Sequence, residues 1–431
     1  MSGVILGSLI LHDFSLFASL ESIGLLFISL LREAWILQTL LFVIFAGAIM
    51  ALIEKSGGVG GFVEFVLHRS KIVKSERSAL MLSYILGVII FVETSITALV
   101  SGAVGKPLCD KYKIPHAKLA YVCDSTAAPI GSLIMINGYG ALLLGLITTQ
   151  IDANSMGINA TETLIRAIGY NFYALSALLL AFVFIYFRFE IGAMKKSRYS
   201  THSQLKEGAV GKSMYLMILP VILMVVLLFV FLFVSGGGDI LKGDGSLSIF
   251  LTMLATLVFL FFYYLLSGNM TLSLWGKSAY SGAKSFVPIS FILIFAFALG
   301  NITTELKTGL YLASFASENI TVYFLAGFIF LLSSIISFAT GTSWGTFSIM
   351  IPIAIPMALG MDANIALVIG AVISGGIFGD HCSPISDTTI ISSMAADCEV
   401  IEHVKTQLPY ALIGAFIAFM LFIVFSFLEL F

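Results

Sequence analysis

Charge is scarce in this sequence. Asp, Glu, Lys and Arg together make up 11% of the 431 residues, whereas soluble domains contain about 25%. Hydrophobic residues make up 59%, and the mean hydropathy is +1.05. We therefore expect an all-α polytopic membrane protein whose main partner is the lipid bilayer. The net charge of −2 lacks the basic excess that a phosphate-binding surface needs, so no nucleic-acid partner is expected.

Cysteine is also rare, and its spacing excludes two common kinds of site. The four cysteines form neither a CxxC pair nor a disulfide framework, so free and mostly buried thiols are expected at Cys109, Cys123, Cys382 and Cys398. No basic segment precedes the first apolar run, so a cleaved signal peptide is not indicated. We expect a multi-pass protein of a bacterial inner (plasma) membrane.

Long apolar segments occupy most of the chain and predict about 11–13 membrane spans. Residues 79–108 and 320–359 are short or polar-interrupted pairs, which predicts re-entrant hairpins that enter and leave on one side. Residues 188–213 form a basic stretch, which the positive-inside rule places in the cytoplasm as a linker. The linker divides the chain into a first transmembrane half, residues 1–187, and a second, residues 214–431.

The two halves resemble each other weakly, at a spacing of about 250 residues. Residues 44–46 match 294–296, Phe91 matches Phe338, and Asp124 before Pro129 matches Asp380 before Pro384. Five basic residues follow the first matched helix, between positions 55 and 77, whereas Lys307 is the only one at the equivalent place before residue 320. The two equivalent loops are therefore expected on opposite sides of the membrane, which predicts two inverted repeats. Inverted repeats with discontinuous helices around a site near the bilayer midplane are typical of transporters.

The stretch 379–389 gathers two acids, a histidine and four hydroxyls in an apolar setting. An ionised aspartate at mid-depth costs roughly 2.5–3.5 kcal/mol, so these acids should face protein, a cavity or an ion. Gly379 and Pro384 both weaken a helix and are expected to interrupt it. We expect a cation site with ligands among Asp380, His381, Ser383, Asp387 and Thr388. His381 has three open roles: metal ligand, proton carrier or hydrogen-bonded structural group.

A second polar run, Thr340 to Thr346, separates two apolar segments. Its hydroxyls, above all Thr342 and Ser343, are neutral oxygen ligands that suit a desolvated sodium ion. The alternative is helix packing through small residues. The first half supplies a counterpart, with Pro129 expected to break the helix and with candidate ligands Glu93, Thr94, Ser95, Asp124 and Ser125.

With these two motifs, at 340–346 and 378–389, the sequence resembles the NhaC-type sodium/proton antiporter family. The resemblance covers roughly residues 286–428 and, more weakly, 40–150. Members of that family are assigned to the ion-transporter superfamily, so it implies inverted repeats, re-entrant hairpins and an elevator-like transport domain. Some relatives exchange organic acids or carry amino acids, so the substrate stays open.

The expected activity is exchange of Na⁺ for H⁺ by competition at shared carboxylates. Asp380 and Asp387 are expected to hold Na⁺, with Asp124 and Glu93 as partners, and no cofactor is expected besides the transported ions. The alternative is a sodium- or proton-coupled carrier of a small organic acid or amino acid, for which Lys106 is a candidate counter-charge. A membrane-embedded hydrolase at His381 would lack a third metal ligand, so no enzyme is expected. A homodimer stays open.

Overall fold

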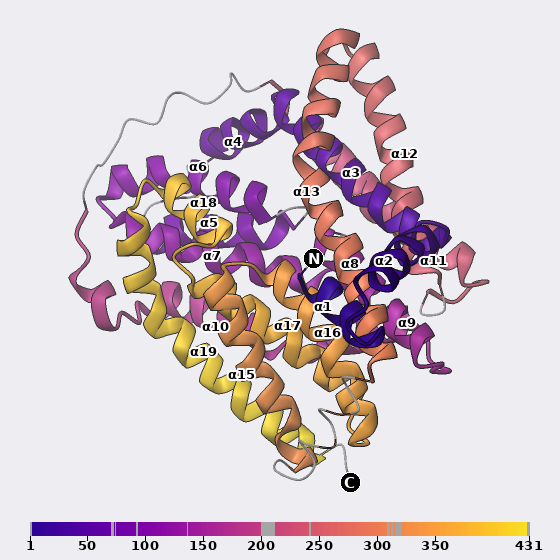
Figure 1. The fold of residues 1–431 in the computed structure, drawn as a ribbon. Coiled ribbons are helices and arrows are strands. Elements are labelled where there is room, and N and C mark those ends of the chain that lie inside the picture. The colour runs from indigo at the N-terminus through magenta and orange to yellow at the C-terminus, as the bar shows by residue number, and fades with distance from the viewer. Residues whose placement is uncertain are drawn as a thin grey trace.

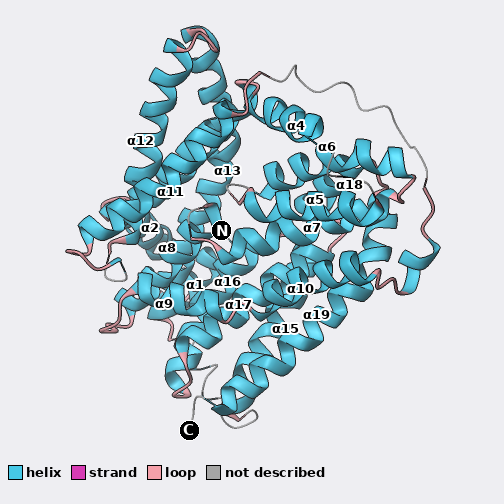
Figure 2. Cartoon of the chain, turned by 180° about the vertical axis from the view of Figure 1, so that it is seen from behind, coloured by secondary structure: helices cyan, strands magenta, loops and turns pink. Residues whose placement is uncertain are grey.

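The computed structural model describes residues 2–69, 73, 75–91, 94–135, 137–199, 212–240, 243–307, 311, 314 and 321–428. Every regular element within these ranges is a helix, which confirms the all-α architecture (Figure 2). In chain order the helices are α1 (Ser2–Leu11), α2 (Leu16–Leu30), α3 (Ala34–Lys55), α4 (Gly58–Arg69), α5 (Glu76–Ile89), α6 (Thr94–Tyr112), α7 (His116–Leu133), α8 (Gly138–Ala153), α9 (Ala160–Gly169), α10 (Phe172–Phe187), the 3-10 helix η2 (Gly192–Lys196), α11 (Tyr215–Ser235), α12 (Gly245–Leu266), α13 (Leu272–Glu305), α15 (Val322–Thr340), α16 (Ser343–Gly360), α17 (Ile365–Cys382), α18 (Asp387–Ala396) and α19 (Val400–Leu428).

The sequence predicts about 11–13 membrane spans for the whole chain, of which the structure describes the ranges given above. Within the described ranges, nine helical segments are long and apolar enough to cross a membrane, and the bent pair α1 and α2 brings the number to ten. Two predicted spans, 79–92 and 94–108, form α5 and α6, which pack against each other. At 14 residues, α5 is about 21 Å long, shorter than a hydrocarbon core of about 30 Å.

One group of helices consists of α3, α11, α12 and α13. Helix α3 packs along α12 and α13, and α12 packs on α11 (Figure 1). Gly47 of α3 and Gly282 of α13 face each other so closely that a Cβ built on Gly47 would lie 2.5 Å from the Gly282 carbonyl oxygen. Small residues at this crossing let the two backbones approach, as is common between membrane helices.

A second group surrounds α17. Helices α15 and α16 pack on α17, α18 packs on α6 and α7, and α19 packs on α10 and α15 (Figure 1). The two groups meet where α8 and α16 contact α13. Sixteen of the eighteen residues of α17 are buried, so this helix runs through protein rather than lipid.

The same order of elements occurs twice along the chain. The helix pair α5–α6 precedes α7 and α8, which are separated by a break at residues 134–137; the pair α15–α16 precedes α17 and α18, separated at 383–386. Discontinuous helices are therefore present in both halves. The opposite orientation of the halves stays a prediction.

The predicted linker, 188–213, falls partly outside the described residues, at 200–211. Its first part packs on α19, because the backbone N–H of Ile191 donates to the Tyr410 hydroxyl at 2.9 Å and Ser197 Oγ donates to Glu402 at 2.9 Å. The division of the chain into two halves around this linker stays a prediction.

Candidate functional site

The break between α17 and α18 surrounds a buried carboxylate, that of Asp380. Its Oδ2 accepts a hydrogen bond from Ser343 Oγ at 2.7 Å, and its Oδ1 accepts one from Ser386 Oγ at 2.6 Å. Ser343 is the first residue of α16, and Ser386 is the N-cap of α18. Three helix ends therefore converge on one carboxylate.

Each of these serines is in turn held by another hydroxyl. Because Ser343 Oγ donates its proton to Asp380, Tyr139 must be the donor in the 2.8 Å contact between Tyr139 Oη and Ser343 Oγ. By the same reasoning Thr388 donates to Ser386 Oγ across 3.0 Å. Two chains of hydroxyl groups thus end on Asp380, one from α8 and α16 and the other from α18.

Local sequence explains why α17 stops where it does. Proline disfavours helical backbone in the residue before it, and Ser383 before Pro384 is extended, at φ −77° and ψ 129°. The helix does not break at Gly379 but three residues later, after Cys382. Gly379 is instead a packing site, since a Cβ there would lie 2.4 Å from the Phe338 backbone nitrogen of α15.

The turn between α15 and α16 brings Ser343 to Asp380. Gly341 ends α15 with φ +66°, a conformation that favours glycine. Thr342 then caps α16 by accepting from the Gly345 N–H, so its hydroxyl is used in the turn. Ser383, another candidate ligand, donates to the Phe338 carbonyl oxygen at 2.9 Å and fastens the break to α15.

A second buried carboxylate, that of Asp124, lies in α7. Its Oδ2 accepts from Gln407 Nε2 at 2.9 Å and from Thr389 Oγ1 at 3.4 Å, and His403 Nε2 lies 3.7 Å away. Its Oδ1 is buried and receives no hydrogen bond within the part of the chain that the structure describes. Since Ser386 contacts Asp380 and Thr389 contacts Asp124, the start of α18 touches both carboxylates.

His381 lies beside these acids as a fully hydrogen-bonded side chain. Its Nδ1 is 2.7 Å from the Tyr173 hydroxyl, and its Nε2 is 3.2 Å from Ser125 Oγ. The structure thereby joins Ser125 of the first half to the motif of the second half. Both ring nitrogens are used, which favours the structural role among the three considered.

The structure places the other predicted residues as follows. Asp387 is the first residue of α18; its side chain is exposed and accepts from the Thr388 N–H at 2.8 Å. Thr94 begins α6, half-buried beside Gly131 of α7. Pro129 lies inside α7, which continues to Leu133 before it breaks. Glu93 and the side chain of Ser95 lie outside the described residues.

The predicted site residues leave out six residues of this site: Tyr139, Tyr173, Ser386, Thr389, His403 and Gln407. Ser386 stands inside the polar stretch 379–389 and could have been included. His403 and Gln407 stand four residues apart, a spacing that puts them on one face of a helix. Tyr139 carries no signal in the sequence.

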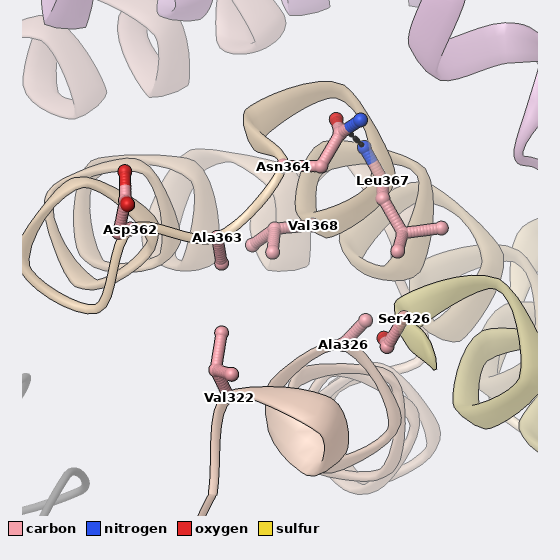
Figure 3. Close-up of a pocket in the computed structure, with 8 residues that line it drawn as sticks. All are labelled: Val322, Ala326, Asp362, Ala363, Asn364, Leu367, Val368 and Ser426. Carbon is pink, nitrogen blue, oxygen red and sulfur yellow. Dashed lines mark hydrogen bonds between the residues drawn. The ribbon is translucent and has the colours of Figure 1, made fainter. Parts of the chain in front are cut away.

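A cavity of about 220 Å³ lies at the other end of α17 (Figure 3). Val322, Ala326, Leu367 and Val368 give it apolar walls, and Asp362 and Asn364 are among its polar lining residues. Asn364 is the N-cap of α17 and accepts from the Leu367 N–H at 3.0 Å. Asp380 follows Asn364 by sixteen positions along α17, a distance of about 24 Å, so the cavity is separate from the Asp380 carboxylate.

Both hydrogen-bond donors to Asp380 are hydroxyl groups, and oxygen is the ligand atom that hard cations prefer. Asp124 instead accepts from one amide nitrogen and one hydroxyl. Among the described residues, no three His, Cys, Asp or Glu side chains gather as a metal-binding group. All four cysteines are buried and free, as predicted.

A model of the Na⁺/H⁺ antiporter family matches residues 133–427, from the end of α7 to α19. The chain belongs to this family. The match includes Tyr139, Ser343, Asp380 and Gln407, whereas Asp124 precedes it. The family assignment confirms the resemblance drawn from the two motifs.

Two relatives and one solved structure are similar to this chain over different shares of its length. An uncharacterized protein of Haemophilus influenzae is 32% identical over 95% of this chain and 83% of its own. The malate-2H⁺/Na⁺-lactate antiporter of Bacillus subtilis is 38% identical over 25% of this chain and 23% of its own. The YdaH transporter of Alcanivorax borkumensis shares the fold, with a TM-score of 0.67 at 15% identity over 94% of this chain and 88% of its own. The protein is therefore a multi-pass membrane transporter of the antiporter kind and not an enzyme.

Proposed function

We propose that this antiporter exchanges sodium for protons by competition at Asp380, with Asp124 as the second carboxylate. The observation that carries the proposal is the burial of Asp380 among hydroxyl groups. An ionised carboxylate out of water is costly unless a positive charge accompanies it. Asp380 would therefore hold either Na⁺ or H⁺, and a group that cannot hold both couples the two movements.

The surrounding hydroxyls suit both states of the carboxylate. A serine hydroxyl has one proton to donate and two lone pairs to offer. When Asp380 is ionised without a cation, Ser343 and Ser386 donate to it, as their 2.7 and 2.6 Å contacts indicate. When Na⁺ is bound, the same oxygens would turn their lone pairs toward the ion. No side chain would have to leave the site.

The alternative substrate, a small organic acid or amino acid, would need a positive group to receive its carboxylate. Lys106, the candidate for that role, pairs instead with Asp110 at 3.2 Å and with Asp397 at 3.5 Å. Its charge is thus already compensated, which favours inorganic ion exchange. Because the Bacillus subtilis relative is named as a malate-2H⁺/Na⁺-lactate antiporter, the test below also includes transport of an organic acid.

Everted membrane vesicles with an acid interior provide that test. Sodium chloride without any organic solute should release protons from the lumen, and Asp380→Asn should stop the release. Asp362→Asn is the matched control, since Asp362 is exposed at the other end of α17. Proton release that requires added lactate, malate or an amino acid would instead establish the alternative.

The orientation and location of the protein belong to the same proposal. A bacterial inner membrane fits the two bacterial relatives. The repeated order of helix pair and broken helix supports two inverted halves that bring Asp124 and Asp380 together near the midplane.

A further inference from the structure

Two polar side chains of α19, His403 and Gln407, are fully buried beside the carboxylates. They stand one turn apart on a helix that is otherwise largely apolar. Burying an amide and an imidazole is costly unless every polar atom has a partner. Each polar side-chain atom of His403 and Gln407 has a hydrogen-bond partner.

The amide of Gln407 connects the two halves of the protein. Its Nε2 donates to Asp124 Oδ2 of α7 at 2.9 Å and also to the backbone oxygen of His381 in α17. Asp124 and His381 are 257 positions apart in the sequence, and His381 directly follows Asp380. One side chain thus fixes the distance between the first carboxylate and the end of the helix that carries the second.

His403 fixes which way that amide points. Both partners of Gln407 Nε2 are acceptors, so the NH₂ group must face them and Oε1 must face His403 Nε2, which lies 2.8 Å away. His403 therefore donates from Nε2. Its Nδ1 is 2.8 Å from Ser393 Oγ of α18, so the ring is held at both nitrogens. A flipped amide would put its carbonyl oxygen against a carboxylate.

We propose that Gln407, oriented by His403, is a positioning residue for cation binding. It holds Asp124 through Oδ2 alone and leaves Oδ1, the oxygen without a hydrogen-bond donor among the described residues, to receive the exchanged ion. It also sets where α17 ends relative to Asp124. This inference rests on the proposed function, because it assigns the free oxygen to the transported cation.

Gln407→Met tests the inference. Methionine keeps the length of the side chain and removes the donor. Because a hydrogen bond to an ionised group is stronger than one between neutral groups, the sodium concentration for half-maximal exchange should rise at least tenfold. The maximal rate at saturating sodium should change less than threefold. The matched control is Gln150→Met, because Gln150 is buried in α8 and its amide has no partner among the described residues.

Substitutions at His403 keep the test decisive if Gln407→Met fails to fold. His403→Gln retains a donor near the position of Nε2 and should restore most of the sodium affinity that His403→Leu loses. Equal sodium affinity in these two variants, or a change below twofold in Gln407→Met, would overturn the positioning role. A shift of the same size in Gln150→Met would overturn it as well.

Sodium binding can be measured separately from exchange. The purified protein in detergent should be stabilised against heat by sodium chloride relative to choline chloride, and Gln407→Met should move the midpoint of that titration to at least tenfold higher sodium. If sodium stabilises the wild type but the wild type moves no protons, the proposal of sodium/proton exchange is wrong. The positioning role is then tested by the midpoint of the sodium titration of Gln407→Met alone. An unmoved midpoint in Gln407→Met overturns the positioning role even where exchange is observed.

Discussion

Replacing Asp380 with asparagine removes one charge from the site at nearly constant shape. Two charges 4 Å apart attract by about 4 kcal/mol at an effective dielectric constant near 20. At about 1.4 kcal/mol per factor of ten, loss of this attraction weakens sodium binding roughly a thousandfold. The amide also cannot take up the exchanged proton. Sodium-dependent exchange should therefore disappear at any practical sodium concentration.

The same substitution should leave the fold intact. Asparagine can accept through Oδ1 but not through Nδ2, so either Ser343 or Ser386 loses its acceptor, at a cost of about 1–3 kcal/mol. Removal of a buried charge works in the opposite direction. Expression and elution as a single peak in size-exclusion chromatography should match the wild type.

Proton release from everted vesicles on sodium addition is the assay, with Asp362→Asn as the control. Asp387→Asn is informative beside it, because that side chain is exposed and should matter less than Asp380. If Asp380→Asn and Asp387→Asn both exchange normally, the polar stretch 379–389 is structural and the mechanism is refuted.

Three further predictions follow from competition, topology and packing. If sodium and protons share a carboxylate, the sodium Km should rise about tenfold per unit of pH below the pKa of that carboxylate, and saturating sodium should restore the rate; a Km that stays flat from about pH 6 to 9 while the maximal rate changes would place the proton at a separate site. A cysteine introduced at position 240 should be labelled from outside and one at position 200 should not, because the basic segments 55–77 and 188–213 are expected in the cytoplasm; labelling of both from outside would contradict the inverted repeats. Gly379→Ala should lower the thermal unfolding temperature, since the added Cβ would lie 2.4 Å from the Phe338 nitrogen, whereas Gly157→Ala, with no atom within 4 Å, should not; equal unfolding temperatures would show that α15 and α17 can separate without cost.

Local patterns in the sequence were sufficient to predict the class of the protein and the part of the site that lies at the end of α17. Scarce charge and long apolar runs indicate a helical membrane protein because unpaired backbone groups are too costly in lipid. Proline at 384 predicts the break in α17 because its ring excludes helical backbone before it. Asp380 is conspicuous because an acid is expensive in an apolar segment. Hydropathy alone does not distinguish a short helix such as α5 from a full span, so it gives the number of spans only as a range.

Tertiary structure alone decided which polar groups meet. Asp387 and Asp380 stand in one motif, yet Asp387 is exposed while Ser386, Thr388 and Thr389 turn inward at the start of α18. Asp124, Tyr139 and Gln407 join the site from three other helices. In a soluble protein an apolar stripe tells which face of a helix is buried, but a membrane helix is apolar toward lipid and toward protein alike. The sequence of such a helix therefore shows which of its residues are polar but not which groups those residues contact. The packing of α7, α8, α17 and α19 determines those contacts.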